Sequence, residues 1–168
     1  VIKDKMERVE QREWAEAAVI AVNATFPSSL EIASWPFWQR YLPQARECMT
    51  HIEYWDMASL EASVLLNNAG QYLKEHAQYM EAERFTQRAL AINEQLLGTE
   101  SSATAITLSN LAALYVEQGK YVEAEPLMLR ALAIAEQVQV SEHPNTATHF
   151  NSLAVGIDPR TGTVVANT

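Results

Sequence analysis

The chain has 168 residues and is 48% hydrophobic and 20% charged, which is enough apolar material for a folded domain rather than a disordered tail. Its formal net charge of −9 argues against nucleic acid or an anionic membrane as a direct partner, because both need clustered Lys and Arg. The single cysteine, Cys48, excludes an internal disulfide and fits a reducing compartment. We expect a cytoplasmic protein, and the opening at Val1 without a Met predicts an excised or processed fragment.

The N-terminal region, residues 1–58, is expected to form a helical cap. A first helical pattern runs from about residue 6 to residue 26 and ends at Pro27. The residues that it would bury on one face are Trp14, Ala18, Ala21 and Val22.

A cluster of large apolar residues follows, and we interpret it as part of the core of this cap rather than as a binding site. Its members are Trp35, Trp38, Tyr41 and Leu42. Pro43 is expected to open a second helix that runs to about Tyr54. The residues that this helix would bury are Ala45, Cys48, Met49 and Ile52.

A long internal repeat is the strongest pattern in the sequence. When residues 65–106 are laid on residues 107–148 without a gap, 17 of 42 positions are identical. A third copy begins at His149 and stops at Val155. The organisation that this predicts is two repeats, 59–100 and 101–142, then a partial repeat, 143–155, and a non-repeat tail, 156–168.

Each repeat is expected to form two helices. The first helix of the second repeat has an apolar face with i, i+3, i+4, i+7 spacing, made of Leu108, Leu111, Ala112 and Tyr115. Gly119 ends it, and Ala77 at the matching position predicts a looser turn in the first repeat. The second helix would bury Ala124, Met128, Ala131, Leu132 and Ala135. Because neither helix can bury its apolar face alone, we expect an all-α, right-handed α-solenoid of antiparallel helix pairs.

The repeat strings resemble a known family. LSNLAALYVEQGKYVEAEPLMLRALAI (Leu108 to Ile134) and SEHPNTA (Ser141 to Ala147) are similar to tetratricopeptide repeats, in particular the long units of kinesin light chains and of many bacterial signalling proteins. The resemblance covers about residues 61–155 and implies a module that binds a protein or peptide and catalyses no reaction.

The N-terminal region resembles the segment that precedes such repeats in bacterial STAND-type NTPases. The similar strings are WAEAAVIAVNATFP (Trp14 to Pro27), Trp35-Pro36 and RYLPQA (Arg40 to Ala45). In those proteins an NB-ARC-like ATPase domain comes first and the repeats act as its sensor. The resemblance implies that this chain is such a sensor and that the ATPase lies outside it.

Asparagine and serine residues recur on the first helix of each unit, beside its apolar face. In the resembled family, Asn at matching positions contacts the backbone of a bound peptide. The alternative, that these side chains bond neighbouring helices and order the stack, stays open. The predicted peptide-binding residues are Asn67, Asn68, Gln71, Lys74, Ser109, Asn110, Ala113, Glu117, Asn151 and Ser152, with Glu75 and Val116 beside them.

Other candidate chemistry is weak. The pairs Glu81/Glu83 and Glu123/Glu125 suggest acid–base catalysis, but residues two apart on a helix point in different directions. Cys48 and His51 have half of a metal-site spacing and no second pair accompanies them. The sequence thus predicts no enzyme, no metal and no cofactor.

A structural role is the alternative function. The incomplete third repeat leaves apolar Phe150 and Leu153 at its end, and two copies could pair there as a homodimeric scaffold. The tail from Gly156, which is typical of turn and loop, could instead cover that end.

Overall fold

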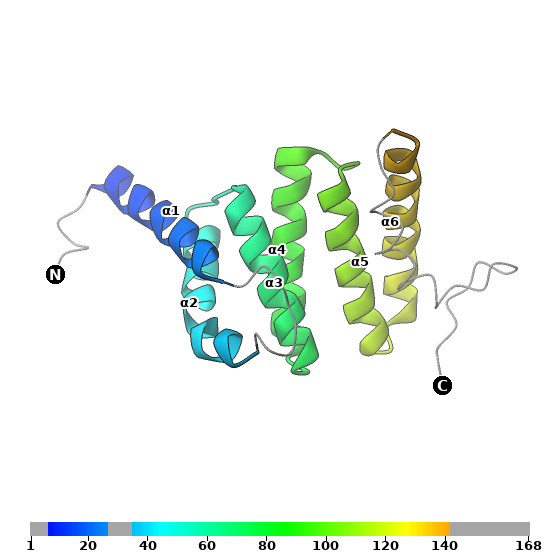
Figure 1. Cartoon of the computed structure of the whole chain (residues 1–168), viewed down its shortest axis with the longest axis horizontal. Helices are drawn as coiled ribbons and strands as arrows, with labels where there is room; N and C mark the ends of the chain where they lie inside the picture. The colour runs from blue at the N-terminus through cyan, green and yellow to red at the C-terminus, as the bar shows by residue number, and fades with distance from the viewer. Residues whose placement is uncertain (1–6, 27–34, 142–168) are drawn as a thin grey trace, which may run out of the picture. The chain divides into compact units, whose positions relative to one another are not determined.

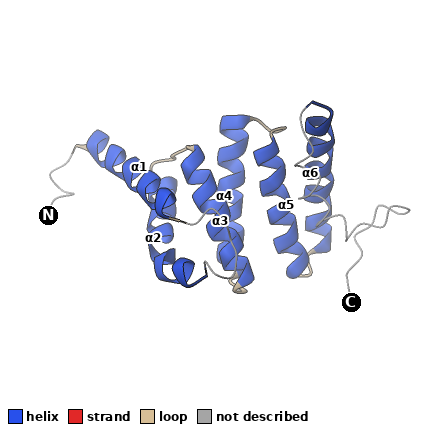
Figure 2. Ribbon diagram, viewed as in Figure 1, coloured by secondary structure: helices blue, strands red, loops and turns tan. Residues whose placement is uncertain are grey.

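The computed structural model describes residues 7–26 and 35–141. These residues form α-helices and loops and contain no strand (Figure 2), which confirms the expected all-α repeat fold. The helices in Figure 1 are α1 (Arg8–Thr25), α2 (Trp35–Tyr54), α3 (Leu60–Glu75), α4 (Tyr79–Leu97), α5 (Ser102–Glu117) and α6 (Tyr121–Ser141). The chain divides into two compact units, Val1–Leu96 and Leu97–Thr168. None of the helices in the described ranges combines the length and apolar character of a membrane span.

The first unit contains α1 to α4. Helix α1 packs against α2 and α3, and α2 packs against α3. Helix α3 meets α4 where the Ser63 hydroxyl donates to Asn93 Oδ1 (2.5 Å). Gly70 faces Thr86 and the Ala82 carbonyl so closely that a methyl group at Gly70 would clash with the Thr86 hydroxyl. The largest fully buried side chains of this unit are Trp38, Met49, Ile52, Leu65, Leu66, Leu73, Phe85 and Ile92.

The second unit contains the helical hairpin α5–α6, whose two helices pack closely together. Its core holds many small side chains, which allow the helices to approach each other. The buried apolar residues are Ala105, Leu108, Leu111, Ala112, Leu114, Ala124, Ala131, Ile134 and Ala135.

The two predicted hairpins begin with the same cap. The side chain of Ser59 accepts a hydrogen bond from the amide of Ala62 (3.1 Å), and that of Ser101 accepts one from the amide of Thr104 (3.1 Å). A serine in this role satisfies one of the free N–H groups of the first turn. The two serines occupy the same position of the repeat, so the sequence period fixes where α3 and α5 start.

The turns within the two hairpins are also alike, so the looser turn predicted at Ala77 is wrong. Ala77 and Gly119 both have a positive φ, 56° and 71°. The Gln78 amide donates to the Leu73 carbonyl (2.9 Å), and the matching Lys120 amide donates to the Tyr115 carbonyl (2.8 Å). The hydrogen bonds that close the helix end therefore impose a left-handed conformation on an alanine, which favours it less than glycine does.

The buried face of α1 differs from the predicted one. Trp14 is 70% exposed, and Ala18 and Ala21 are exposed too, whereas Ala15 and Val19 are buried. Apolar residues surround much of this helix, so its sequence does not select one face. The contacts with α2 and α3 select the stripe that starts at Ala15.

Helix α2 begins well before Pro43, at Trp35, so the predicted start at that proline is wrong. Pro43 lies inside the helix with its side chain exposed. A single buried stripe crosses it at helical spacing, and burial of that stripe favours a continuous helix despite the missing N–H. The stripe is Trp38, Leu42, Ala45, Met49 and Ile52. Burial of Ala45, Cys48, Met49 and Ile52 was predicted and is confirmed.

Two residues of the predicted α6 core are not fully buried. Met128 is half-buried, and Leu132 is 40% exposed because the buried stripe of α6 runs through Ala124, Ala131 and Ala135 and leaves Leu132 at its edge. The expectations for Phe150, Asn151, Ser152, Leu153 and the tail 156–168 fall outside the described residues.

Candidate functional site

The predicted binding residues that the structure describes lie on the first helix of each hairpin, α3 and α5. Both helices have the same bounds relative to the repeat, since Leu60 and Ser102 start them and Glu75 and Glu117 end them. The matched caps described above therefore place residues that are equivalent in the repeat at the same turn of each helix.

On α3, the predicted residues form a half-buried stripe beside the core. Asn67, Asn68, Gln71 and Lys74 are each neither fully buried nor fully exposed, at a spacing that puts them on adjoining turns. The Lys74 ammonium lies 3.1 Å from the Glu75 carboxylate, so the stripe ends in an ion pair rather than an isolated cation. Asn67 and Lys74 already take part in interactions within the chain, and a ligand would have to compete with these.

On α5, the predicted residues separate into two groups. Asn110 and Ala113 are half-buried and Glu117 is exposed, whereas Ser109 is only 6% exposed. Ser109 is therefore the least accessible of the predicted binding residues that lie within the described part of the chain. Asn68 and Asn110 match in the repeat and are half-buried in both helices. Asn110, like Asn67 on α3, already takes part in an interaction within the chain, with which a ligand would have to compete.

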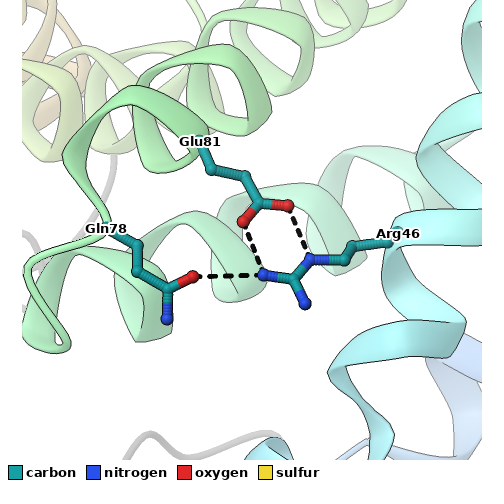
Figure 3. A network of polar contacts seen from close by, with 3 residues as sticks. All are labelled: Arg46, Gln78 and Glu81. Atoms are coloured by element: carbon teal, nitrogen blue, oxygen red, sulfur yellow. Dashed lines mark hydrogen bonds and ion pairs between the residues drawn. The ribbon is translucent and has the colours of Figure 1, made fainter.

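A set of polar contacts that sequence reasoning missed holds α2 against α4. In Figure 3, Arg46 clamps Glu81 with its Nε and Nη2 atoms at 2.7 and 2.6 Å, and its Nη2 also donates to Gln78 Oε1 at 3.1 Å. Arg84 pairs in the same two-pronged way with Glu53. We call these contacts, with the pair Arg88–Asp56 (2.8 Å), the charge ladder. From the sequence, the charge ladder could have been predicted only from the presence of opposite charges on separate segments.

The charge ladder holds one of the paired acids, Glu81, in an ion pair with Arg46. Hydrogen bonds from Arg46 lower the pKa of Glu81, and hydrogen bonds from Arg84 lower the pKa of Glu53, in both cases against the opposing effect of partial burial. A carboxylate held ionised by an arginine is a poor general acid at neutral pH. Glu81 therefore has a structural role.

Cys48 is a structural residue of the α2 core. Its side chain is buried, and burial, with a smaller effect from the charge of Glu47, raises the pKa of the Cys48 thiol to about 11. A thiol that stays protonated at neutral pH is a weak nucleophile and metal ligand. Within the described ranges, no group of three or more His, Cys, Asp or Glu side chains is placed to hold a metal ion.

The aromatic cluster is also part of the core of the first unit. The ring of Trp38, which is fully buried, lies 4.3 Å from that of Phe26 and 5.9 Å from that of Tyr72, between centroids. It thus joins α2 to the end of α1 and to α3, as a core residue does.

Comparison with known proteins agrees with this architecture. A search of curated proteins finds no match to the chain. Residues 60–137 and 104–155 match the tetratricopeptide repeat family. Together these segments span more than half of the chain, and they cover α3, α4, α5 and α6. Repeats of this family mediate contacts between proteins and have no catalytic activity of their own. The chain therefore belongs to the tetratricopeptide repeat family.

Proposed function

We propose that this chain binds an extended peptide through the first helices of its hairpins, with Asn68 and Asn110 bonding the peptide backbone. The observation that carries the proposal is their matched position in the repeat, on helices that start and end alike. An asparagine side chain offers both a donor and an acceptor, which is what a peptide backbone requires. Half-burial restricts its rotamers, so less conformational entropy is lost on binding.

The proposal is tested with a peptide selected from a random display library against the whole chain. Its affinity for the wild type and for Asn68→Ala and Asn110→Ala is measured by calorimetry. Loss of a polar contact that binding desolvates costs about 1–3 kcal/mol, so each variant should bind roughly 5- to 150-fold more weakly. Gln95→Ala, an exposed amide on α4, is the control and should bind normally. Unchanged affinity in both asparagine variants contradicts the assignment.

We further propose that the chain is the sensor of a STAND-type ATPase, so that peptide binding regulates a neighbouring nucleotide-binding domain. This rests on the resemblance of residues 14–45 to the segment that precedes such repeats. The test is to determine the gene sequence upstream of Val1. A phosphate-binding loop and a winged-helix region there support the proposal, and an upstream sequence of another class contradicts it.

A further inference from the structure

The end of α2 repeats the end of α4, although the family match begins only at residue 60. Asp56 and Gly98, which follow α2 and α4, both have a positive φ, 45° and 87°, and are separated by one period of the repeat. Arg88 donates through Nη2 to the Met57 carbonyl (3.2 Å), and Arg130 donates through Nη2 to the Thr99 carbonyl (3.3 Å). Both arginines bond a carbonyl that lies 31 residues earlier in the chain. The segment after α2 therefore makes the same contact with an arginine of the following second helix as the segment after α4 does.

The packing of the first unit agrees with this equivalence. The charge ladder joins Arg46 to Glu81, Glu53 to Arg84 and Asp56 to Arg88. The partners follow the same order along both helices, so α2 and α4 lie side by side and parallel, as second helices of successive units do. Helix α1 contacts both α2 and α3, which is the position of a first helix.

We propose that α1 and α2 form a third, sequence-diverged repeat unit, and that a pocket between the first helices α1 and α3 takes an aliphatic side chain of the bound peptide. This proposal rests on the proposed peptide-binding function and adds a specificity pocket to it.

The pocket has a volume of about 150 Å³. Buried apolar residues from three segments of the chain line it, namely Val19, Met57 and Ala62, and Ile20, which is 51% exposed, forms part of its wall. A cavity of about this size can hold a group as large as benzene. Its apolar walls are interrupted by the polar side chains of Arg12, Glu16 and Ser59. It is too small for a whole ligand and suits one branched aliphatic side chain.

The negative charge of the protein favours a basic residue next to the aliphatic residue in the bound peptide. Arg12 and Glu16 also line the pocket and pair with each other, the Arg12 Nε lying 3.0 Å from Glu16 Oε1. Helix α1 carries three acidic and two basic side chains, and the whole chain has a net charge of −9. An aliphatic residue followed by Lys or Arg therefore matches the pocket better than one followed by an acid.

The pocket is tested with capped dipeptides, Leu-Lys, Leu-Glu and Asp-Lys, added to the whole chain and followed by NMR. We expect Leu-Lys to shift the signals of Val19, Ile20, Met57 and Ala62, Leu-Glu to bind several-fold more weakly, and Asp-Lys to shift none of them. Equal shifts with Asp-Lys, or none with Leu-Lys, would overturn the assignment. This result does not depend on Asn68 or Asn110, so failure of the pocket and failure of the proposed function are distinguishable.

Variants of the lining residues test whether the NMR shifts caused by Leu-Lys arise from binding in the pocket. Ile20→Asp puts a charge on the half-exposed wall, and Ala58→Phe fills the space, so each should abolish the Leu-Lys shifts. Val9→Asp is the matched control, because Val9 is an exposed apolar residue of the same helix outside the pocket. Shifts that persist in both pocket variants contradict the proposal.

Hydrogen exchange tests the third repeat unit. If α1–α2 is an integral repeat, amides of α2 should exchange as slowly as those of α4, and Glu53→Lys should speed exchange in both helices. Combining it with Arg84→Glu, which reverses the pair, should restore slow exchange. Exchange in α2 that is much faster than in α4, and indifferent to both substitutions, contradicts a shared unit.

Discussion

The hairpins α3–α4 and α5–α6 share their ends and differ in their interiors. Ser59 and Ser101 cap them alike, and Ala77 and Gly119 close their turns alike. Between these fixed points, residues that pack against each other in the first hairpin are both replaced at the matching positions of the second. The comparison shows that the repeat preserves the backbone boundaries, while each core needs only to fill its own volume.

Two exchanges illustrate this. Gly70 accommodates Thr86 across the first hairpin, and the matching residues of the second are Ala112 and Met128. Ser63 donates to Asn93 Oδ1 at 2.5 Å, and the matching residues are the buried Ala105 and Ala135. In the second exchange a hydrogen-bonded pair is replaced as a unit by an apolar one, so no buried polar group loses its partner.

The largest effect is expected from Gly70→Ala. The added methyl would clash with the Thr86 hydroxyl, and overpacking of this kind costs about 1–3 kcal/mol of unfolding free energy. Urea denaturation followed by tryptophan fluorescence measures it, because all four tryptophans lie within residues 14–55 and report on the first unit. Adding Thr86→Ala should recover part of the loss. A Gly70→Ala variant as stable as wild type would contradict the close contact.

Ser63→Ala should cost about 1–2 kcal/mol, because it removes a donor from the buried Asn93 amide oxygen. Asn93→Ala should have a similar effect. The double variant, which copies the Ala105 and Ala135 arrangement of the second hairpin, should cost less than the sum of the two. Strictly additive losses in the same denaturation experiment would show that the pair is not exchanged as a unit.

Ala77→Gly should stabilise the chain by about 0.5–1 kcal/mol, because glycine adopts the positive φ at position 77 without steric strain. Gly119→Ala should destabilise the second unit by a similar amount. Helix content followed by circular dichroism during thermal unfolding measures both. Changes of the same sign would break the equivalence of the two turns.

The smallest effect concerns the charge ladder in the first unit. The lowered pKa values of Glu53 and Glu81 mean that their contribution to stability is full above the ordinary carboxyl value of 4.5 and is lost as pH falls through the lowered values. Both pairs are partly exposed, so Glu53→Gln and Glu81→Gln should each cost only about 0.2–1 kcal/mol at pH 7.

Acid denaturation checks the sign of this effect. The double glutamine variant should lose less stability than wild type between pH 5 and pH 3 (roughly the window in which carboxylates titrate). An equally steep decline would show that other carboxylates dominate.

The sequence by itself determined the repeat period, the two hairpins and the family. Helix starts, ends and buried stripes within the repeat depend on local caps and on helical periodicity, and both are visible in a single chain.

Only the tertiary structure decided which face of α1 is buried, where α2 begins and which ion pairs form between α2 and α4. The apolar residues of α1 surround the helix, so contacts with α2 and α3 had to select Ala15 and Val19 over Trp14. Pro43 lies within α2 because a buried stripe crosses it, which outweighs the local preference for a helix start. The charge ladder joins residues that are far apart in the sequence, and no local rule relates them. Long-range packing selects among locally acceptable alternatives, because its free energy exceeds the small differences between them.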